Sequence, residues 1–195
     1  MMKRIFDLLF AVLGVILLFP ILIIISCIIK LTSKGSAFFI QERVGKEGKT
    51  FRMIKFRSMY VVNKSYSTIS VKGDVRITKI GAVLRRYKLD ELPELWNVLV
   101  GDMSLVGPRP DVAGYADKLE GEDRNILKLR PGITGLASLK FANEEAFLSK
   151  QDDPEKFNDE IIYPEKVRLN LDYYYNHNLW IDIKIIFATI FRTSY

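Results

Sequence analysis

The sequence predicts an α+β fold that is mostly helical and is attached to a membrane near its N-terminus. Three observations support this prediction: a long apolar run without charges, one pair of strand-like segments, and several helical segments separated by Gly/Pro turns. A chain of 195 residues suits one domain besides such an anchor. We therefore place the anchor at residues 1–34 and a single domain with interfacial helices at residues 35–195.

The apolar run extends from Leu8 to Ile29 and contains 22 residues without a charged side chain. A helix of this length can cross a bilayer. The run is longer than the apolar core of a signal peptide, and no small-residue cleavage pattern follows it, so we expect it to be retained. Pro20 divides it into apolar pieces of 12 and 9 residues. Neither piece alone spans about 30 Å of hydrocarbon.

The charges beside this run favour a re-entrant helix that is broken at Pro20 and enters and leaves the membrane on one side. Both flanks are basic, with Lys3, Arg4, Lys30 and Lys34. Because cytoplasmic flanks of membrane segments tend to carry Lys and Arg, both ends are expected on the cytoplasmic face. A kinked helix that spans the bilayer is the alternative, since membrane helices tolerate proline. Asp7 is expected to pair with Lys3 or Arg4.

The domain is expected to begin with a small β-hairpin and to continue with short helices. Residues 37–41 and 50–54 are the predicted strands, on either side of a Gly-rich turn. Residues 63–73 are polar without periodicity and predict a loop. Helices are expected at 78–87, with Thr78 as N-cap, and at 90–100, 123–129, 144–150, 164–175 and 179–191. The last helix is too charged to span a membrane, and either lies at the interface or packs on the core.

The composition points to an anionic partner and a reducing compartment. The net charge is +6, and the first 110 residues carry 18 Lys and Arg against 8 Asp and Glu. A basic region beside an apolar segment suits lipid headgroups, phosphate ligands or nucleic acid. No helix-turn-helix or RNA-binding motif is visible and the second half is acidic, which argues against nucleic acid. The single cysteine excludes a disulfide framework, and the single histidine excludes a metal site built on several histidines.

An acidic pair, Asp90 and Glu91, lies in the most informative stretch of the sequence. Pro93 is tolerated only in the first turn of a helix, so the pair is expected at a helix N-terminus. The ordinary reading is an N-cap with favourably placed carboxylates. However, Arg85, Arg86 and Lys88 precede the pair closely, and cations at a helix start are typical of a phosphate site.

An aspartate that is kept ionised among cations has two chemical uses. It can attack phosphorus to form an acyl phosphate, or it can bind Mg²⁺ together with phosphate oxygens. Adjacent carboxylates on a helix point about 100° apart, because 3.6 residues make one turn. The pair therefore suits two separate tasks, with one group as nucleophile and the other as metal or orienting ligand.

Further candidates come from turns that carry cations or aromatic residues. Lys55 follows a predicted strand, and Arg109 stands between two prolines that present its guanidinium for bidentate phosphate contact. For each, a solvated surface position is the alternative. The segment Arg130–Gly135 resembles a phosphate-binding loop in composition but lacks the ending of a Walker loop. The residues around Asp172 are rich in tyrosine and either stack on a base or pack in the core.

Together these motifs resemble the small monotopic phosphoglycosyl transferases of the bacterial sugar transferase family. The matching stretches are Lys3–Asp7, the apolar run with Pro20, Gln41–Gly45, Lys55–Met59, Leu89–Leu99, Gly101–Pro110, Arg130–Gly135 and Leu171–Tyr174. They occur in order along nearly the whole chain. The segment after Gly135 departs from the pattern of many members, which leaves the preferred sugar open. The chain resembles a minimal catalytic form.

The resemblance implies a reaction, a cofactor and a location. Asp90 is expected to attack the β-phosphate of a UDP-sugar, releasing UMP, and the phosphosugar then passes to a polyprenyl phosphate such as undecaprenyl phosphate. Glu91 is expected to assist, with Asp90 and Glu91 holding Mg²⁺; Lys55, Arg85 and Arg109 bind the diphosphate, and Arg130, Thr134 and Asp172 border the nucleotide-sugar pocket. The resemblance further implies that this transfer is the first membrane step of O-antigen, capsule, exopolysaccharide or glycoprotein glycan synthesis.

The same resemblance places the protein on the cytoplasmic face of the bacterial inner membrane, with downstream glycosyltransferases as partners and no nucleic acid. A membrane-tethered module that binds anionic lipids or nucleotides without turnover is the rival hypothesis. The two differ at Asp90, because a binding module would tolerate Asp90→Asn.

Overall fold

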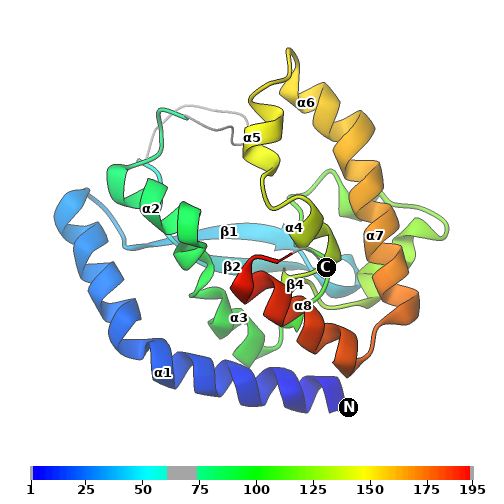
Figure 1. Ribbon diagram of the computed structural model, residues 1–195, viewed down its shortest axis with the longest axis horizontal. Coiled ribbons are helices and arrows are strands. Elements are labelled where there is room, and N and C mark those ends of the chain that lie inside the picture. The colour runs from blue at the N-terminus through cyan, green and yellow to red at the C-terminus, as the bar shows by residue number, and fades with distance from the viewer. Residues whose placement is uncertain (1, 61–73, 194–195) are drawn as a thin grey trace.

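The computed structural model describes residues 2–60 and 74–193 and confirms a mostly helical α+β fold (Figure 1). The helices are α1 Met2–Thr32, α2 Lys79–Tyr87, α3 Glu94–Val100, α4 Leu136–Lys140, α5 Glu144–Leu148, α6 Pro154–Phe157, α7 Tyr163–Asn176 and α8 Leu179–Phe191. The strands are β1 Phe38–Val44, β2 Thr50–Phe56, β3 Ser104–Val106 and β4 Gly132–Thr134. The loop expected at 63–73 lies outside the described residues.

Most expected elements are present, with two differences of helix type. The hairpin is confirmed and is longer than expected, and Thr78 caps α2 by accepting a hydrogen bond from the Gly81 amide at 2.9 Å. Residues 123–128 form a 3₁₀ helix instead of the expected α-helix. The α-helix expected from Asp90 begins only at Glu94.

Helix α1 is long and bent, and it continues through Pro20 without the expected interruption. In Figure 1 it runs along the base of the molecule and then turns upward at the left. Proline removes one hydrogen bond and crowds the preceding turn, which kinks a helix without necessarily ending it. Among the described residues, α1 is the one helix that is long and apolar enough to cross a membrane, and most of its surface is exposed. Re-entry into one leaflet stays a prediction.

Polar contacts fasten the first turns of α1 to the domain. Asp7 does not pair with Lys3 or Arg4, as the sequence suggested, but accepts hydrogen bonds from the Ser104 hydroxyl at 2.8 Å and the Leu105 amide at 3.2 Å. Its neighbours take other partners: Lys3 pairs with Asp182 of α8 at 2.6 Å, and Arg4 donates to the Val98 and Leu99 carbonyls near the end of α3. The expectation failed because the partners are distant in sequence.

Helix α3 is attached to the hairpin through the side chain of Asn97. Its Nδ2 donates to the Arg52 carbonyl at 2.8 Å, and its Oδ1 accepts from the Ile54 amide at 3.1 Å. Asn97 thereby supplies β2 with the hydrogen bonds that a further strand would make. A buried cluster of Ala11, Met53, Val98 and Met103 fills the space between α1, β2 and α3. This attachment brings the chain just before α3 against β2.

The short parallel pair of β3 and β4 joins two of the turn motifs. The backbones approach so closely that a Cβ on Gly132 would lie 2.1 Å from the Gly107 nitrogen, and a Cβ on Gly107 would lie 2.4 Å from the Arg130 carbonyl oxygen. Only glycine allows this approach. The turn that carries Arg109 is therefore held in place by the segment from Arg130 to Gly135.

Candidate active site

The acidic pair lies in a tight connection between α2 and α3. Lys88 ends α2 in the left-handed conformation, with φ of 58°, and residues 89–91 form one 3₁₀ turn. Pro93 follows, and α3 starts with the next residue. The expected helix N-terminus is thus a 3₁₀ turn before a helix of only seven residues. Side-chain cations, rather than a helix dipole, set the electrostatics of Asp90 and Glu91.

Glu91 is held by two cations. Its Oε1 accepts from Lys55 Nζ at 3.0 Å and from Arg109 Nη2 at 2.6 Å. Burial acts to raise the pKa of Glu91, but the attraction of Arg109 and Lys55 outweighs it and lowers the pKa well below the usual range. Glu91 is therefore anionic and immobilised, which suits an orienting role.

Glu94 is a third carboxylate at the site that the sequence analysis did not select. Its side chain is buried, with 1% of the residue exposed, and its Oε1 lies 3.1 Å from Lys55 Nζ. Burial, more than any other factor, raises the pKa of Glu94. Its spacing of three residues from Glu91 was the available signal, since residues three apart share a helix face. Lys55 thus serves two carboxylates at once.

Asp90 differs from Glu91 and Glu94 because none of the described residues forms an ion pair with it. The residue is 8% exposed, and its buried Oδ1 has no hydrogen-bond partner in the part of the chain that the structure describes. Burial and then the charge of Glu91 raise the pKa of Asp90, against the attraction of Lys55, Arg85 and Lys88. An uncommitted carboxylate oxygen among cations is chemically suited to bond to an electrophile or to a metal ion.

Asp90, Glu91 and Glu94 together form the acidic cluster. Two of the three expected phosphate-binding cations contact this cluster directly. Lys55 and Arg109 do so through Glu91. Arg85 of α2 acts on Asp90 electrostatically, but its guanidinium pairs with Glu145 of α5. Arg43 lies in the matching stretch Gln41–Gly45 and was given no role from the sequence. It donates to the Pro110 carbonyl at 3.3 Å and so supports the turn that carries Arg109.

The other expected pocket residues make contacts elsewhere. Arg130 Nε donates to the Gly101 carbonyl at 2.8 Å, and the Thr134 hydroxyl lies 2.6 Å from that of Thr189. Asp172 is exposed on α7 and accepts from Asn176. Among the described residues, none of these three forms a hydrogen bond or ion pair with Asp90 or Glu91. Tyr173, in the same aromatic stretch, packs in the core.

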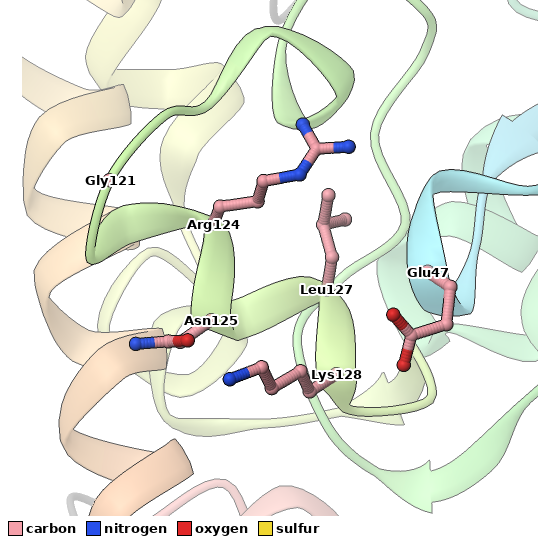
Figure 2. A pocket seen from close by; sticks show the side chains of 6 residues that line it. All are labelled: Glu47, Gly121, Arg124, Asn125, Leu127 and Lys128. Carbon is pink, nitrogen blue, oxygen red and sulfur yellow. The ribbon is translucent and has the colours of Figure 1, made fainter.

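A surface hollow lies in another part of the molecule, beside the 3₁₀ segment 123–128 (Figure 2). Its lining residues are Glu47, Gly121, Arg124, Asn125, Leu127 and Lys128. None of them belongs to the expected site, so the acidic cluster is the candidate active site on chemical grounds rather than by the shape of this hollow.

Comparison with known proteins assigns the family. The chain is 39% identical over 194 residues to UDP-glucose:undecaprenyl-phosphate glucose-1-phosphate transferase of Klebsiella pneumoniae, covering 97% of this chain and 39% of that protein. It is 37% identical over 196 residues to UDP-N-acetylgalactosamine-undecaprenyl-phosphate N-acetylgalactosaminephosphotransferase of Aeromonas hydrophila, covering 96% and 42%. It is 32% identical over 204 residues to the exopolysaccharide production protein ExoY of Sinorhizobium fredii, covering 96% and 83%.

The first two relatives are therefore much longer than this chain, which spans about two fifths of their length. The family match itself covers residues 1–194, from α1 through the acidic cluster to the end of α8. The chain belongs to the bacterial sugar transferase family.

Proposed function

We propose that the protein transfers a phosphosugar from a UDP-sugar to a polyprenyl phosphate, with undecaprenyl phosphate as the acceptor. The names of the relatives support this reaction class, since they describe UDP-sugar:undecaprenyl-phosphate sugar-phosphate transferases. Because those names include both glucose and N-acetylgalactosamine, the sugar of this protein is left open. The lipid-linked product would be the substrate of downstream glycosyltransferases.

The observation that carries the proposal is the buried, uncommitted Oδ1 of Asp90. In the first step this oxygen bonds to the β-phosphorus, and the bond from that phosphorus to the bridging oxygen breaks, so UMP leaves with the oxygen. In the second step a phosphate oxygen of the acceptor bonds to the same phosphorus and Asp90 is released as a carboxylate. Such a covalent intermediate divides one difficult transfer into two easier steps.

The cations beside Asp90 suit the charge that develops during both steps. Lys55 and Arg109 are already placed against Glu91, so they meet the diphosphate in a prearranged position. Arg85 now pairs with Glu145 on the separate helix α5. To bind the substrate, Arg85 would exchange Glu145 for a phosphate oxygen. Positioning and charge neutralisation account for most of the catalysis of phosphoryl transfer.

Mg²⁺ is a further part of the proposal. No cluster of three or more His, Cys, Asp or Glu that could hold a metal occurs among the described residues. The donor set nevertheless fits Mg²⁺, which is often bound by one or two carboxylates together with substrate phosphates. Asp90 and Glu91 would hold it, and the bound ion would neutralise phosphate charge.

We also propose that the protein is monotopic on the cytoplasmic face of the bacterial inner membrane. The exposed apolar surface of α1 supports membrane association. Single cysteines at Met2 and Lys34, in a Cys27→Ser background, should react with an impermeant reagent from the same side of sealed inner-membrane vesicles. Reaction from opposite sides would show a span instead of re-entry.

The covalent step is tested by incubating the protein with a panel of UDP-sugars without acceptor. We expect UMP release in an amount that matches the protein, and a phosphosugar added to the mass of the peptide that contains Asp90. Asp90→Asn is the matched control and should give neither signal. A wild-type protein that binds UDP-sugar and releases no UMP in the presence of undecaprenyl phosphate would support the binding-module hypothesis instead.

A further inference from the structure

Two exposed phenyl groups, Phe38 and Phe39, are neighbours at the start of β1 and point to opposite faces of the hairpin. They are 43% and 49% exposed. The ring of Phe38 stacks on that of Phe56 with centroids 5.4 Å apart, and Phe56 is buried against Ile25 and Ile29 of α1. Phe38 therefore continues the apolar surface of α1 onto the hairpin.

Phe39 points to the opposite face of the hairpin, because successive side chains of a strand alternate. The register places it directly opposite Lys55 of β2, and directly opposed residues of an antiparallel pair share a face. Lys55 in turn lies 3.0 Å from Glu91. Phe38 thus adjoins the apolar helix on one face of the hairpin, and Phe39 shares the other face with a cation of the acidic cluster.

A ligand that matches this arrangement has an apolar chain that ends in a phosphate. The UDP-sugar has no such chain, whereas the polyprenyl phosphate of the proposed function has both parts. Resting on that function, we propose that Phe39 binds the isoprenoid unit nearest the phosphate of the acceptor. The phosphate is then held at Lys55, within reach of the phosphorus bonded to Asp90.

The test separates the two halves of the reaction in the full chain, reconstituted in vesicles that contain undecaprenyl phosphate. Phe39→Ser should raise the acceptor KM about tenfold, as expected for losing roughly half the burial of one phenyl group. Phe39→Leu should restore most of the affinity, because it keeps an apolar side chain. UMP release with donor alone should change less than about twofold, since the acceptor takes no part in that step.

Phe187→Ser is the matched control, since Phe187 is an exposed phenyl group on α8, 57% exposed. It should leave the acceptor KM unchanged. An unchanged acceptor KM in Phe39→Ser would overturn the inference, as would a rise that merely parallels weaker vesicle binding in both variants. If the wild-type protein itself forms no lipid product, the proposed function fails, and that result is distinct from a failure of the Phe39 contact alone.

Discussion

Two groups of buried carboxylates lie in different parts of the molecule and differ in their hydrogen-bond and ion-pair partners. Where α1 meets α8 and β3, Asp7 and Asp182 have partners: Asp7 accepts from a hydroxyl and an amide, and Asp182 accepts from Lys3 at 2.6 Å and Tyr173 at 2.5 Å. At the acidic cluster, Lys55 and Arg109 both bind one oxygen of Glu91, while the Oδ1 of Asp90 has no partner in the described chain.

The comparison separates carboxylates that hold the structure together from one that is available for chemistry. A buried polar group without a partner costs free energy, so it is retained where function requires it. The difference predicts that substitutions in the first group change mainly stability and that substitution of Asp90 changes mainly activity. Four experiments test this division.

Asp90→Asn should have the largest effect on activity. Turnover with UDP-sugar and undecaprenyl phosphate should fall to the detection limit, because an amide cannot form the acyl phosphate. The melting temperature should stay the same or rise, since one poorly compensated buried charge is removed. Turnover assays and thermal melts in the same detergent check both parts, and residual activity near the wild-type value would contradict the assignment of the nucleophile.

Lys55→Met should affect both properties, because Lys55 joins Glu91 to Glu94. Removing the shared cation leaves two buried carboxylates facing each other, which should cost about 3 kcal/mol of unfolding free energy. Activity should be lost with it. Lys55→Arg keeps the charge and should recover most of the stability, whereas equal melting temperatures for all three proteins would show that the ion pairs contribute little.

Asp182→Asn should lower stability and spare activity. The amide still accepts from Tyr173 but loses the charge that holds Lys3, at a cost of about 2 kcal/mol. For a protein of this length that corresponds to a fall in Tm of roughly 4 to 8 °C. Turnover per folded molecule should remain close to that of the wild type at a temperature below both melting transitions. A selective loss of turnover would break the division proposed above.

Asp111 belongs to neither group of carboxylates, and its substitution is expected to have the smallest effect on stability. Burial raises its pKa to about 6, although Lys166 and Arg43 attract the charged form. The unfolded chain releases this proton near pH 3.8 and the folded chain only near pH 6, so rising pH destabilises the fold across that window. Asp111→Asn should therefore raise Tm at pH 7.5 more than at pH 4. Melting curves at both pH values check this, and a pH-independent difference would contradict it.

The parts of the site that were predictable from the sequence depend on local chemistry. Thr78 caps its helix through a residue three positions on, and Arg109 was selected for its turn. Lys55 was expected just after a strand and instead lies within β2. Glu94 was missed because its role depends on Lys55, a residue 39 positions earlier in the chain.

The same reasoning explains the errors in the fold. Asp7 was assigned a neighbour in sequence, but its partners Ser104 and Leu105 lie in β3, far along the chain. The start of α3 was predicted too early, because a 3₁₀ turn precedes it. That turn lies between the left-handed Lys88 and Pro93, and neither residue alone indicates it in the sequence. Helix α1 continues through Pro20 instead of ending there, and both of its parts pack on the domain.

Helix α3 sets the distance between the start of α1 and Asp90. Arg4 donates to carbonyls near the end of α3, and Asp90 lies four residues before the first residue of α3. The start of α1 and the acidic pair are thus connected through the seven residues of α3, about 10 Å long, and the 3₁₀ turn that precedes it. In the proposed function, a connection this short would hold Asp90 at a fixed distance from α1, so a lipid acceptor would reach it by diffusion in the plane of the membrane.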